Sequence, residues 1–152
     1  MGLKKVIYTA GSYDIFHFGH LNILLKAKKM GSFLLVGVST DALIARYKGL
    51  KPVICYKDRA SIIKEIKCVD RVIKQSSFFD IKQLKKYHID IIVLGNDWEG
   101  KSFPELEKCA KELNIKVVYV PYTQRLSTSK IKEKIIRNSV EIIQSQTKRK
   151  NE

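Results

Sequence analysis

Residues 5–20 have the sequence KVIYTAGSYDIFHFGH, in which an apolar run passes through a glycine loop into a helix start. A helix start presents free backbone N–H groups and the positive end of the helix dipole, so it favours phosphate. His17 and His20 can both point at a phosphate held there, and Gly19 lets the backbone approach closely. The alternative is that one histidine caps the helix and the other is satisfied in the loop. We predict a phosphate site at the end of the first strand.

Outward from this stretch, apolar runs alternate with segments of helical period along the whole chain. The expected strands are 5–9, 33–38, 71–73, 91–95 and 116–120, and the expected helices are 21–30, 58–66, 80–87, 103–113 and 127–144, with a short one after Asp41. Residues 46–52 are expected as a loop. Such alternation gives right-handed β-α-β units, so we predict an α/β protein with a Rossmann-like, doubly wound, mostly parallel five-stranded sheet. Ligands bind beyond the carboxyl ends of such strands, which places the loops 9–20, 39–51, 95–101 and 121–129 around one crevice.

The composition is that of one globular domain with a strongly basic surface. The chain has 152 residues, with 29 Lys and Arg against 15 Asp and Glu, a formal net charge of +14. No apolar run approaches the ~20 residues of a membrane span, so we expect a cytoplasmic protein without membrane partners. Cys55, Cys68 and Cys109 lack metal-ligand spacing and are expected to be reduced core thiols. We assign residues 1–144 to the domain and expect a disordered basic tail at 145–152.

The excess of lysine leaves open a second interpretation, a basic module that binds nucleic acid. Much of it lies in helix-like stretches such as 26–29 and 82–86, which is typical of a solvated face. Aromatic residues do not interleave with the basic ones, and no recognition helix stands out. We therefore expect attraction of small anions and no nucleic-acid partner.

Residues 11–20 resemble the His-x-Gly-His signature of the nucleotidyltransferase α/β phosphodiesterase superfamily, and the likeness covers about residues 4–136. Within it the chain resembles the cytidylyltransferases, most closely those that use glycerol 3-phosphate. The resemblance implies that His17 and His20 are catalytic. It also implies that the nucleotide contacts Thr9, Ala10, Gly11, Ser12, Tyr13 and Gly19 as well as both histidines. Adenylyltransferases share the signature, so it does not choose the nucleotide.

Residues 95–100 have the sequence GNDWEG, similar to the GDDWEG loop of the glycerol-3-phosphate enzymes. An acidic and aromatic loop after a central strand suits a small polyol. The resemblance therefore assigns Asp97 and Trp98 to the acceptor, and Asp97 also to the nucleotide. Asn96 replaces the family's first Asp, which leaves amide hydrogen bonding in place of a charge. The alternative is a tight turn in which Trp98 only packs.

Residues 122–131 have the sequence YTQRLSTSKI and resemble the family's Arg-Thr-Glu-Gly-Ile-Ser-Thr motif before the last helix. Hydroxyl groups at a helix start form a second anion site. The resemblance extends nucleotide binding to Tyr122, Thr123, Arg125, Ser127, Thr128 and Ser129. Tyr122 stands where the family has Arg, and Arg125 where it has Gly. We expect the Arg125 guanidinium to clamp the triphosphate from this neighbouring position.

Lysines in the loop after the second strand contact phosphates in the family. The resemblance assigns Lys48 to the acceptor phosphate and Lys51 to CTP and to catalysis. It also places Asp14 and Lys82 at the acceptor. For the three lysines, the alternative is a solvated surface side chain.

Together these resemblances imply transfer of CMP from CTP to sn-glycerol 3-phosphate, giving CDP-glycerol and pyrophosphate. No nucleophilic Ser, Cys or Lys constellation is visible, so direct in-line attack is the economical mechanism. Mg²⁺ is expected as a cofactor held mainly by the CTP phosphates, with no metal ligand assigned to the protein. Other acceptors, such as phosphocholine, phosphoethanolamine or another polyol phosphate, and ATP in place of CTP, stay open. The family often forms homodimers, and we expect one.

Overall fold

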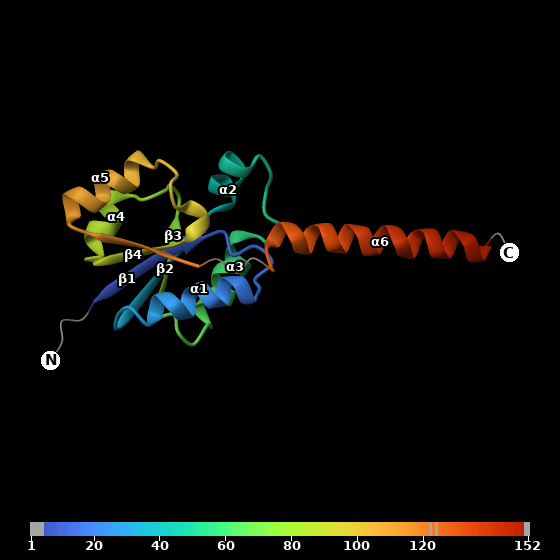
Figure 1. Ribbon diagram of the computed structural model, residues 1–152, viewed down its shortest axis with the longest axis horizontal. Coiled ribbons are helices and arrows are strands. Elements are labelled where there is room, and N and C mark those ends of the chain that lie inside the picture. The colour runs from blue at the N-terminus through green and yellow to red at the C-terminus, as the bar shows by residue number, and fades with distance from the viewer. Residues whose placement is uncertain (1–4, 122, 124, 151–152) are drawn as a thin grey trace.

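The computed structural model describes residues 5–121, 123 and 125–150, which form a sheet covered by helices and one long terminal helix (Figure 1). The strands are β1 (Val6–Gly11), β2 (Phe33–Ser39), β3 (Arg71–Gln75), β4 (Ile91–Gly95) and β5 (Lys116–Val120). The helices are α1 (Phe18–Lys28), α2 (Asp41–Lys48), α3 (Tyr56–Lys64), α4 (Ile81–Lys86), α5 (Pro104–Leu113) and α6 (Thr128–Lys150), with a 3-10 turn η1 (Asn96–Trp98) after β4.

The five strands lie in the order β3-β2-β1-β4-β5, and every neighbouring pair is parallel. Ile7 of β1 pairs with Leu34 of β2 on one side and with Ile91 of β4 on the other. The chain runs outward from β1 to β3 and then returns to the other side for β4 and β5. The strand order therefore reverses between β1 and β4, where ligands bind in such sheets. The predicted Rossmann-like, doubly wound, five-stranded α/β fold is confirmed.

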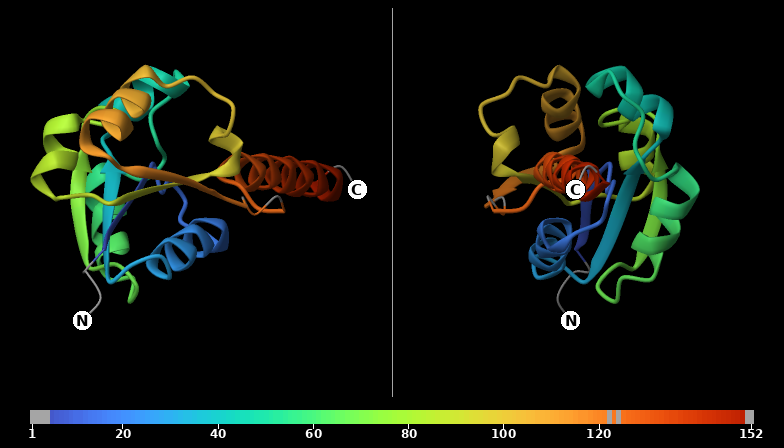
Figure 2. Two further views of the ribbon diagram at one scale, coloured as in Figure 1. Left: turned by 60° about the vertical axis from the view of Figure 1, so that its left-hand side comes forward. Right: turned by 90° about the vertical axis from the view of Figure 1, so that its right-hand side faces the viewer.

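Helices on both faces of the sheet bury two cores, because successive residues of a strand point to opposite sides. On one face, Leu24 of α1 packs into a cluster around Ile7. On the other face, Leu84 of α4 packs into a cluster around Tyr8. The two views of Figure 2 show helices on either side of the sheet.

Two glycines explain where the structure differs from the predicted boundaries. α2 includes residues 46–48, which were expected as a loop, and Gly49 ends it in the left-handed conformation at a φ of 72°. Lys48 is thus held by a helix. Gly31, after α1, does not act as a left-handed cap like Gly49. A Cβ on Gly31 would lie 2.6 Å from the carbonyl oxygen of Lys5, so the close approach of these two segments requires a glycine.

The terminal helix corrects the expectation of a disordered tail. α6 continues past Gln144 to Lys150, and residues 151–152 lie outside the described residues. No Gly or Pro occurs after Pro121 to end it. Of the described helices, none is long and apolar enough to cross a membrane. Cys55 is exposed and not a core thiol, whereas Cys109 is buried.

Candidate active site

The start of α1 is built by two histidines that cap it. Nδ1 of His17 accepts a hydrogen bond from the Gly19 amide at 3.0 Å, and Nδ1 of His20 accepts one from the His17 amide at 3.4 Å. These reciprocal bonds form a capping box and bring the helix start forward to Phe18 from the predicted Leu21. A Cβ on Gly19 would lie 2.8 Å from Cε1 of His17, so the turn requires glycine.

The capping bonds determine which ring nitrogen of each histidine carries the proton. A neutral imidazole has one acceptor and one donor nitrogen. Because Nδ1 accepts in both rings, we assign the proton to Nε2. Nε2 of His17 is buried and has no hydrogen-bond partner among the described residues. A buried donor without a partner is costly, so this atom suits an acceptor that arrives with a ligand, such as a phosphoryl oxygen. Capping and ligand binding therefore use different atoms of one ring.

Both rings are packed so that they stay neutral. The rings of His17 and His20 stack with their centroids 3.9 Å apart, and the rings of Tyr13 and Phe16 flank His20 at 5.4 and 5.7 Å. Burial, with smaller effects of His17 and Lys48, lowers the pKa of His20 to about 3. Burial also lowers the pKa of His17. At neutral pH both rings are uncharged hydrogen-bond donors.

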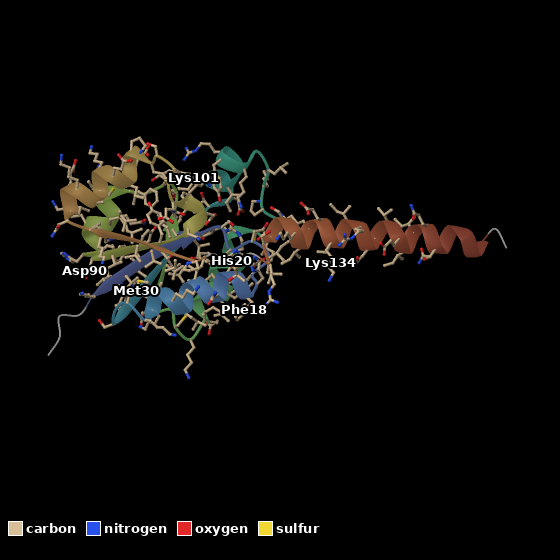
Figure 3. All side chains as sticks on the ribbon, in the orientation of Figure 1. Phe18, His20, Met30, Asp90, Lys101 and Lys134 are labelled. Carbon is tan, nitrogen blue, oxygen red and sulfur yellow. The ribbon has the colours of Figure 1, made fainter. Side chains whose placement is uncertain are left out.

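A cavity of about 440 Å³ opens at the carboxyl ends of β1 and β4. His20 reaches it from α1, and Asp97 and Trp98 reach it from η1. The other residues that line it are Thr9, Ala10, Gly11, Ser12, Tyr13, Ile23, Tyr47, Lys48, Phe78, Leu94, Gly95, Lys101 and Phe103. In Figure 3, His20 lies on the side of the body from which α6 leaves. The structure thus brings the predicted loops 9–20 and 95–101 together around one cavity.

The rings of Tyr47, Phe78, Trp98 and Phe103 form part of the cavity wall, and of these four the sequence analysis identified only Trp98. Neighbouring ring centroids lie 5.2 Å apart for Tyr47 and Phe78, 5.9 Å for Phe78 and Trp98, and 4.8 Å for Trp98 and Phe103. The missed signal is topological. Phe78 follows β3, whose carboxyl end lies at the same edge of the sheet as those of β1 and β4. Trp98 therefore both packs and faces the cavity.

A second cavity of about 340 Å³ lies beside the start of α6 and is rich in lysine. It is lined by Lys48, Lys51 and Lys132, by Thr128 and Ser129, and by Asp14, Ile44, Leu50 and Pro52. Lys48 lines both cavities, so the two are adjacent. Partial burial and the charge of Lys132 lower the pKa of Lys48. An anion bound at this helix start would offset that repulsion. Lys132 was missed by sequence analysis, although it lies one helical turn after Thr128.

Asp14, predicted at the acceptor, is buried and holds the neighbouring loop in place. Its carboxylate accepts hydrogen bonds from the amides of Val53 and Ile54 at 3.1 and 3.0 Å, and from Nζ of Lys132 at 3.0 Å. Burial raises the pKa of Asp14, but the bonds from Ile54, Val53 and Lys132 outweigh it, and the net shift is downward. In this structure the Asp14 carboxylate is thus already occupied.

Arg59 is a positioning residue that the sequence did not reveal. Its side chain is 1% exposed. It donates hydrogen bonds to the carbonyl oxygens of Ser12 and of Ile54, and it pairs with a carboxylate oxygen of Asp41 at 2.5 Å. It thereby ties residues 12–17, the loop between β1 and α1 that we call the phosphate loop, to the start of α2. An arginine in a helical segment is ordinarily expected on the surface.

Other predicted residues lie away from the two cavities. Lys82 lies in the first turn of α4 and lines neither cavity, and Arg125 is exposed and lines neither. Tyr122 lies outside the described residues. Thr123 accepts a hydrogen bond from the side-chain amide of Asn22 at 3.0 Å, which attaches the loop before α6 to α1. Ser127 accepts one from the Lys130 amide at 3.2 Å and so caps α6.

The donor atoms present do not form a protein-built metal cage. Within residues 5–121, 123 and 125–150, no three or more His, Cys, Asp or Glu side chains are grouped to hold a metal ion. The carboxylate of Asp14, in the loop between β1 and α1, already accepts three hydrogen bonds. Any divalent cation here would depend on oxygen atoms supplied by a bound phosphate compound.

Paired histidines lie at the start of α1, at the edge of a parallel sheet where the strand order reverses. This fold and this site are those of a nucleotidyltransferase. The chain belongs to the cytidylyltransferase-like family, whose model matches residues 8–137.

Three comparisons illustrate how similar the chain is to known proteins. Glycerol-3-phosphate cytidylyltransferase of Bacillus subtilis is 40% identical over 134 residues, which cover 88% of this chain and 98% of that protein. Bifunctional protein HldE of Helicobacter pylori is 38% identical over 135 residues, covering 88% of this chain and 28% of that protein. The crystal structure of a lipopolysaccharide core biosynthesis protein from Thermoplasma volcanium superposes with a TM-score of 0.65 at 32% identity, covering 79% of this chain and 97% of the other.

Proposed function

We propose that this protein is a cytidylyltransferase that transfers CMP from CTP to sn-glycerol 3-phosphate, giving CDP-glycerol and pyrophosphate. The observation that carries the proposal is the buried, unpartnered Nε2 of His17 beside His20 at the start of α1. Family membership supports cytidylyl transfer. The Bacillus subtilis relative, named glycerol-3-phosphate cytidylyltransferase, supports the acceptor.

The reaction needs positioned donors more than a base. An acceptor phosphate oxygen forms a bond to the α-phosphorus of CTP, and the bond from that phosphorus to the oxygen bridging the β-phosphate breaks. The acceptor oxygen is already anionic at neutral pH. Charge in the transition state lies on the α-phosphoryl oxygens and the departing pyrophosphate. The Nε2–H groups of His17 and His20 donate to the α-phosphoryl oxygens, and their capping bonds keep them preorganised.

The lysine-lined cavity suits the pyrophosphate end of CTP. Lys48, Lys51 and Lys132 meet there beside the hydroxyl groups of Thr128 and Ser129. Three cations and a helix start complement the charge of the leaving group. Lys48 lies between the two cavities and so can contact both the acceptor phosphate and CTP.

We propose that Mg²⁺ enters on the triphosphate of CTP, since the described residues offer no cage for it. When bound, it supplies charge neutralisation on the phosphates.

A second candidate is the same transfer to a larger or less polar phosphorylated acceptor. The rings of Tyr47, Phe78, Trp98 and Phe103 give the cavity an apolar wall, which a three-carbon polyol does not need. Such a wall suits stacking, or a quaternary ammonium group as in phosphocholine. The HldE relative, at 38% identity, is nearly as similar to this chain as the glycerol-3-phosphate enzyme at 40%.

A matrix of nucleotides and acceptors tests the proposal. CTP and ATP are each combined with glycerol 3-phosphate, phosphocholine, phosphoethanolamine and a polyol phosphate in the presence of Mg²⁺, and pyrophosphate release is measured. We expect the fastest turnover with CTP and glycerol 3-phosphate. The His20→Ala variant controls for contaminating activity, and RNA binding under salt titration tests the nucleic-acid alternative.

Each outcome has a distinct meaning. Preference for phosphocholine with CTP would replace the acceptor and keep the reaction. Preference for ATP would overturn the nucleotide. Tight RNA binding without pyrophosphate release from any pair would overturn the enzyme itself. We further propose that the enzyme works in the cytoplasm, where CTP is available, as a homodimer.

A further inference from the structure

The distal part of α6 carries a row of exposed apolar side chains. Ile135, Ile136, Val140, Ile142 and Ile143 are between 46% and 64% exposed. The helix has 23 residues and leaves the body as a single rod (Figure 1). Lys134 projects from this rod well outside the body (Figure 3).

Most of this segment lies beyond the unit that the family shares. The family model ends at residue 137, within α6. The Bacillus subtilis relative is matched over 98% of its own length by 134 residues of this chain. The distal turns of α6 also line neither cavity. Val140, Ile142 and Ile143 of the apolar face therefore lie beyond the catalytic unit, whereas Ile135 and Ile136 lie at its end.

The apolar residues form a regular, two-ridged face. With about 100° between successive residues, Ile135 and Ile142 form one ridge, and Ile136 and Ile143 form a second. Ser139 lies between the ridges, where its small side chain permits close approach of another helix. Lys134, Arg137 and Glu141 lie on the opposite side of the helix. An isolated helix with such a face is marginal in water and requires an apolar partner.

The sequence of this face is symmetric about its centre. Residues 135–143 have the sequence IIRNSVEII, with an Ile-Ile pair at the same distance on either side of Ser139. Two copies laid antiparallel with Ser139 against Ser139 place residues 135–136 of each copy opposite residues 142–143 of the other. A two-fold interface demands this kind of self-complementary patch. We propose that α6 pairs with α6 of a second copy of this chain, antiparallel and centred on Ser139.

The shape of the molecule favours the antiparallel arrangement over a parallel one. In the right-hand view of Figure 2, where α6 is seen nearly end-on, the body spreads around the helix. Paired helices lie about 8–10 Å apart, so a parallel pair would place two bodies in overlapping space. An antiparallel pair puts them at opposite ends of the helices.

The molar mass in solution, measured by light scattering, tests the pairing. We expect the Ile136→Glu/Ile143→Glu and Ile136→Lys/Ile143→Lys variants each to have half the molar mass of the unchanged chain. Mixing the two in equal amounts is expected to restore the full mass, because opposite charges then meet across the interface. Lys134→Glu/Ser145→Glu, which adds two glutamates on the polar side, should keep the full mass. Pyrophosphate release should persist in all three variants, since none of these residues lines a cavity.

Cross-linking tests the orientation. With Cys55→Ser as background, Ser139→Cys is expected to form a disulfide between copies on oxidation. Ile143→Cys is not expected to form one, because in the antiparallel pair the same position of the second copy would lie about 12 Å away along the helix axis. Equal cross-linking at both positions would replace the antiparallel pair with a parallel one. An unchanged mass in the glutamate and lysine variants would overturn the pairing. If the chain without substitutions does not pair in solution but sediments with anionic lipid vesicles, the face would be assigned to a membrane surface instead.

Discussion

The ammonium group of Lys132 lies 3.0 Å from a carboxylate oxygen of Asp14, which joins the terminal helix to the phosphate loop. Asp14 also accepts the amides of Val53 and Ile54, so a single carboxylate connects three segments that are distant in sequence. The same helix start receives a second tie, because the hydroxyl of Thr128 donates to the carbonyl oxygen of Asp14. The lysine-lined cavity is thus assembled around one buried acidic residue.

Removing this carboxylate should destabilise the fold more than removing its cation. Asp14→Ala leaves two backbone amides without their acceptor, and we expect a loss of roughly 2 kcal/mol in the free energy of unfolding. Lys132→Ala removes a partly exposed partner and should cost about 1 kcal/mol or less. Urea unfolding of both variants and of the double variant measures this. Equal losses would mean that the two amide bonds contribute little.

The two histidines should act on the rate more than on substrate binding. His17→Ala and His20→Ala each remove a preorganised donor, and we expect kcat to fall on the order of a hundredfold or more. Pyrophosphate release at saturating CTP and acceptor measures the effect, with circular dichroism to verify folding. His88→Asn, outside both cavities, is the control. Near-normal kcat in folded His20→Ala would remove that ring from the mechanism.

The buried histidines should also make stability depend on pH. The pKa of His20 is about 3 in the folded chain, below its usual value near 6.5, so the unfolded chain binds a proton first. The free energy of unfolding should therefore fall as the pH falls below about 6.5. Asp14 gives a dependence of the same sign at lower pH: its lowered pKa stabilises the folded chain above about pH 4, and this stabilisation is lost in stronger acid.

Urea unfolding between pH 7 and 5 separates these contributions. The decline in stability should be shallower in His20→Gln than in the unchanged chain. The same slope in both proteins would show that His20 does not titrate as described.

The fold could be predicted because its determinants are local in sequence. The strands at 91–95 and 116–120 match the predicted ranges, and the alternation of strands with helices predicts their parallel pairing. The His-x-Gly-His stretch likewise lies where its glycine and helix-start chemistry indicated. Helix ends were harder to predict, because α2 and α6 both continue through polar residues until a glycine or the described end.

The site was predicted less completely because its supporting residues act across long sequence separations. Arg59 meets Ser12 and Asp41, which are 47 and 18 positions away, so no local pattern marks it as buried. Lys132 meets Asp14 across 118 positions. The aromatic wall combines Tyr47, Phe78 and Phe103 from three different connections. Such residues become visible only when the strand order is known.

Arg59 should prove more important to the fold than an ordinary basic residue of a helix. Arg59→Met leaves the carbonyls of Ser12 and Ile54 and the Asp41 carboxylate without their donor. We expect a loss of roughly 3 kcal/mol in the free energy of unfolding. Arg46→Met, at an exposed position of α2, should cost far less. Equal stability of the two variants would contradict the role of Arg59 as the tie between loop and helix.

Arg125 provides the sharpest test of how this chain departs from its family. It is exposed and lines neither cavity in this structure, yet it stands three positions before Thr128, which lines the lysine-rich cavity. If its guanidinium closes on the triphosphate, Arg125→Ala should raise KM for CTP. The fall in kcat/KM for CTP should correspond to a loss of about 1.5–3 kcal/mol of transition-state stabilisation. Restoring the family pattern with Tyr122→Arg in that background should recover part of the loss. A change in kcat/KM for CTP of less than about twofold, as for an ordinary exposed charge, would show that Arg125 only decorates the loop. An unchanged KM for CTP with a raised KM for the acceptor would instead assign Arg125 to the phosphoalcohol. That result would count against glycerol 3-phosphate as the acceptor, because the glycerol enzymes have glycine at that position.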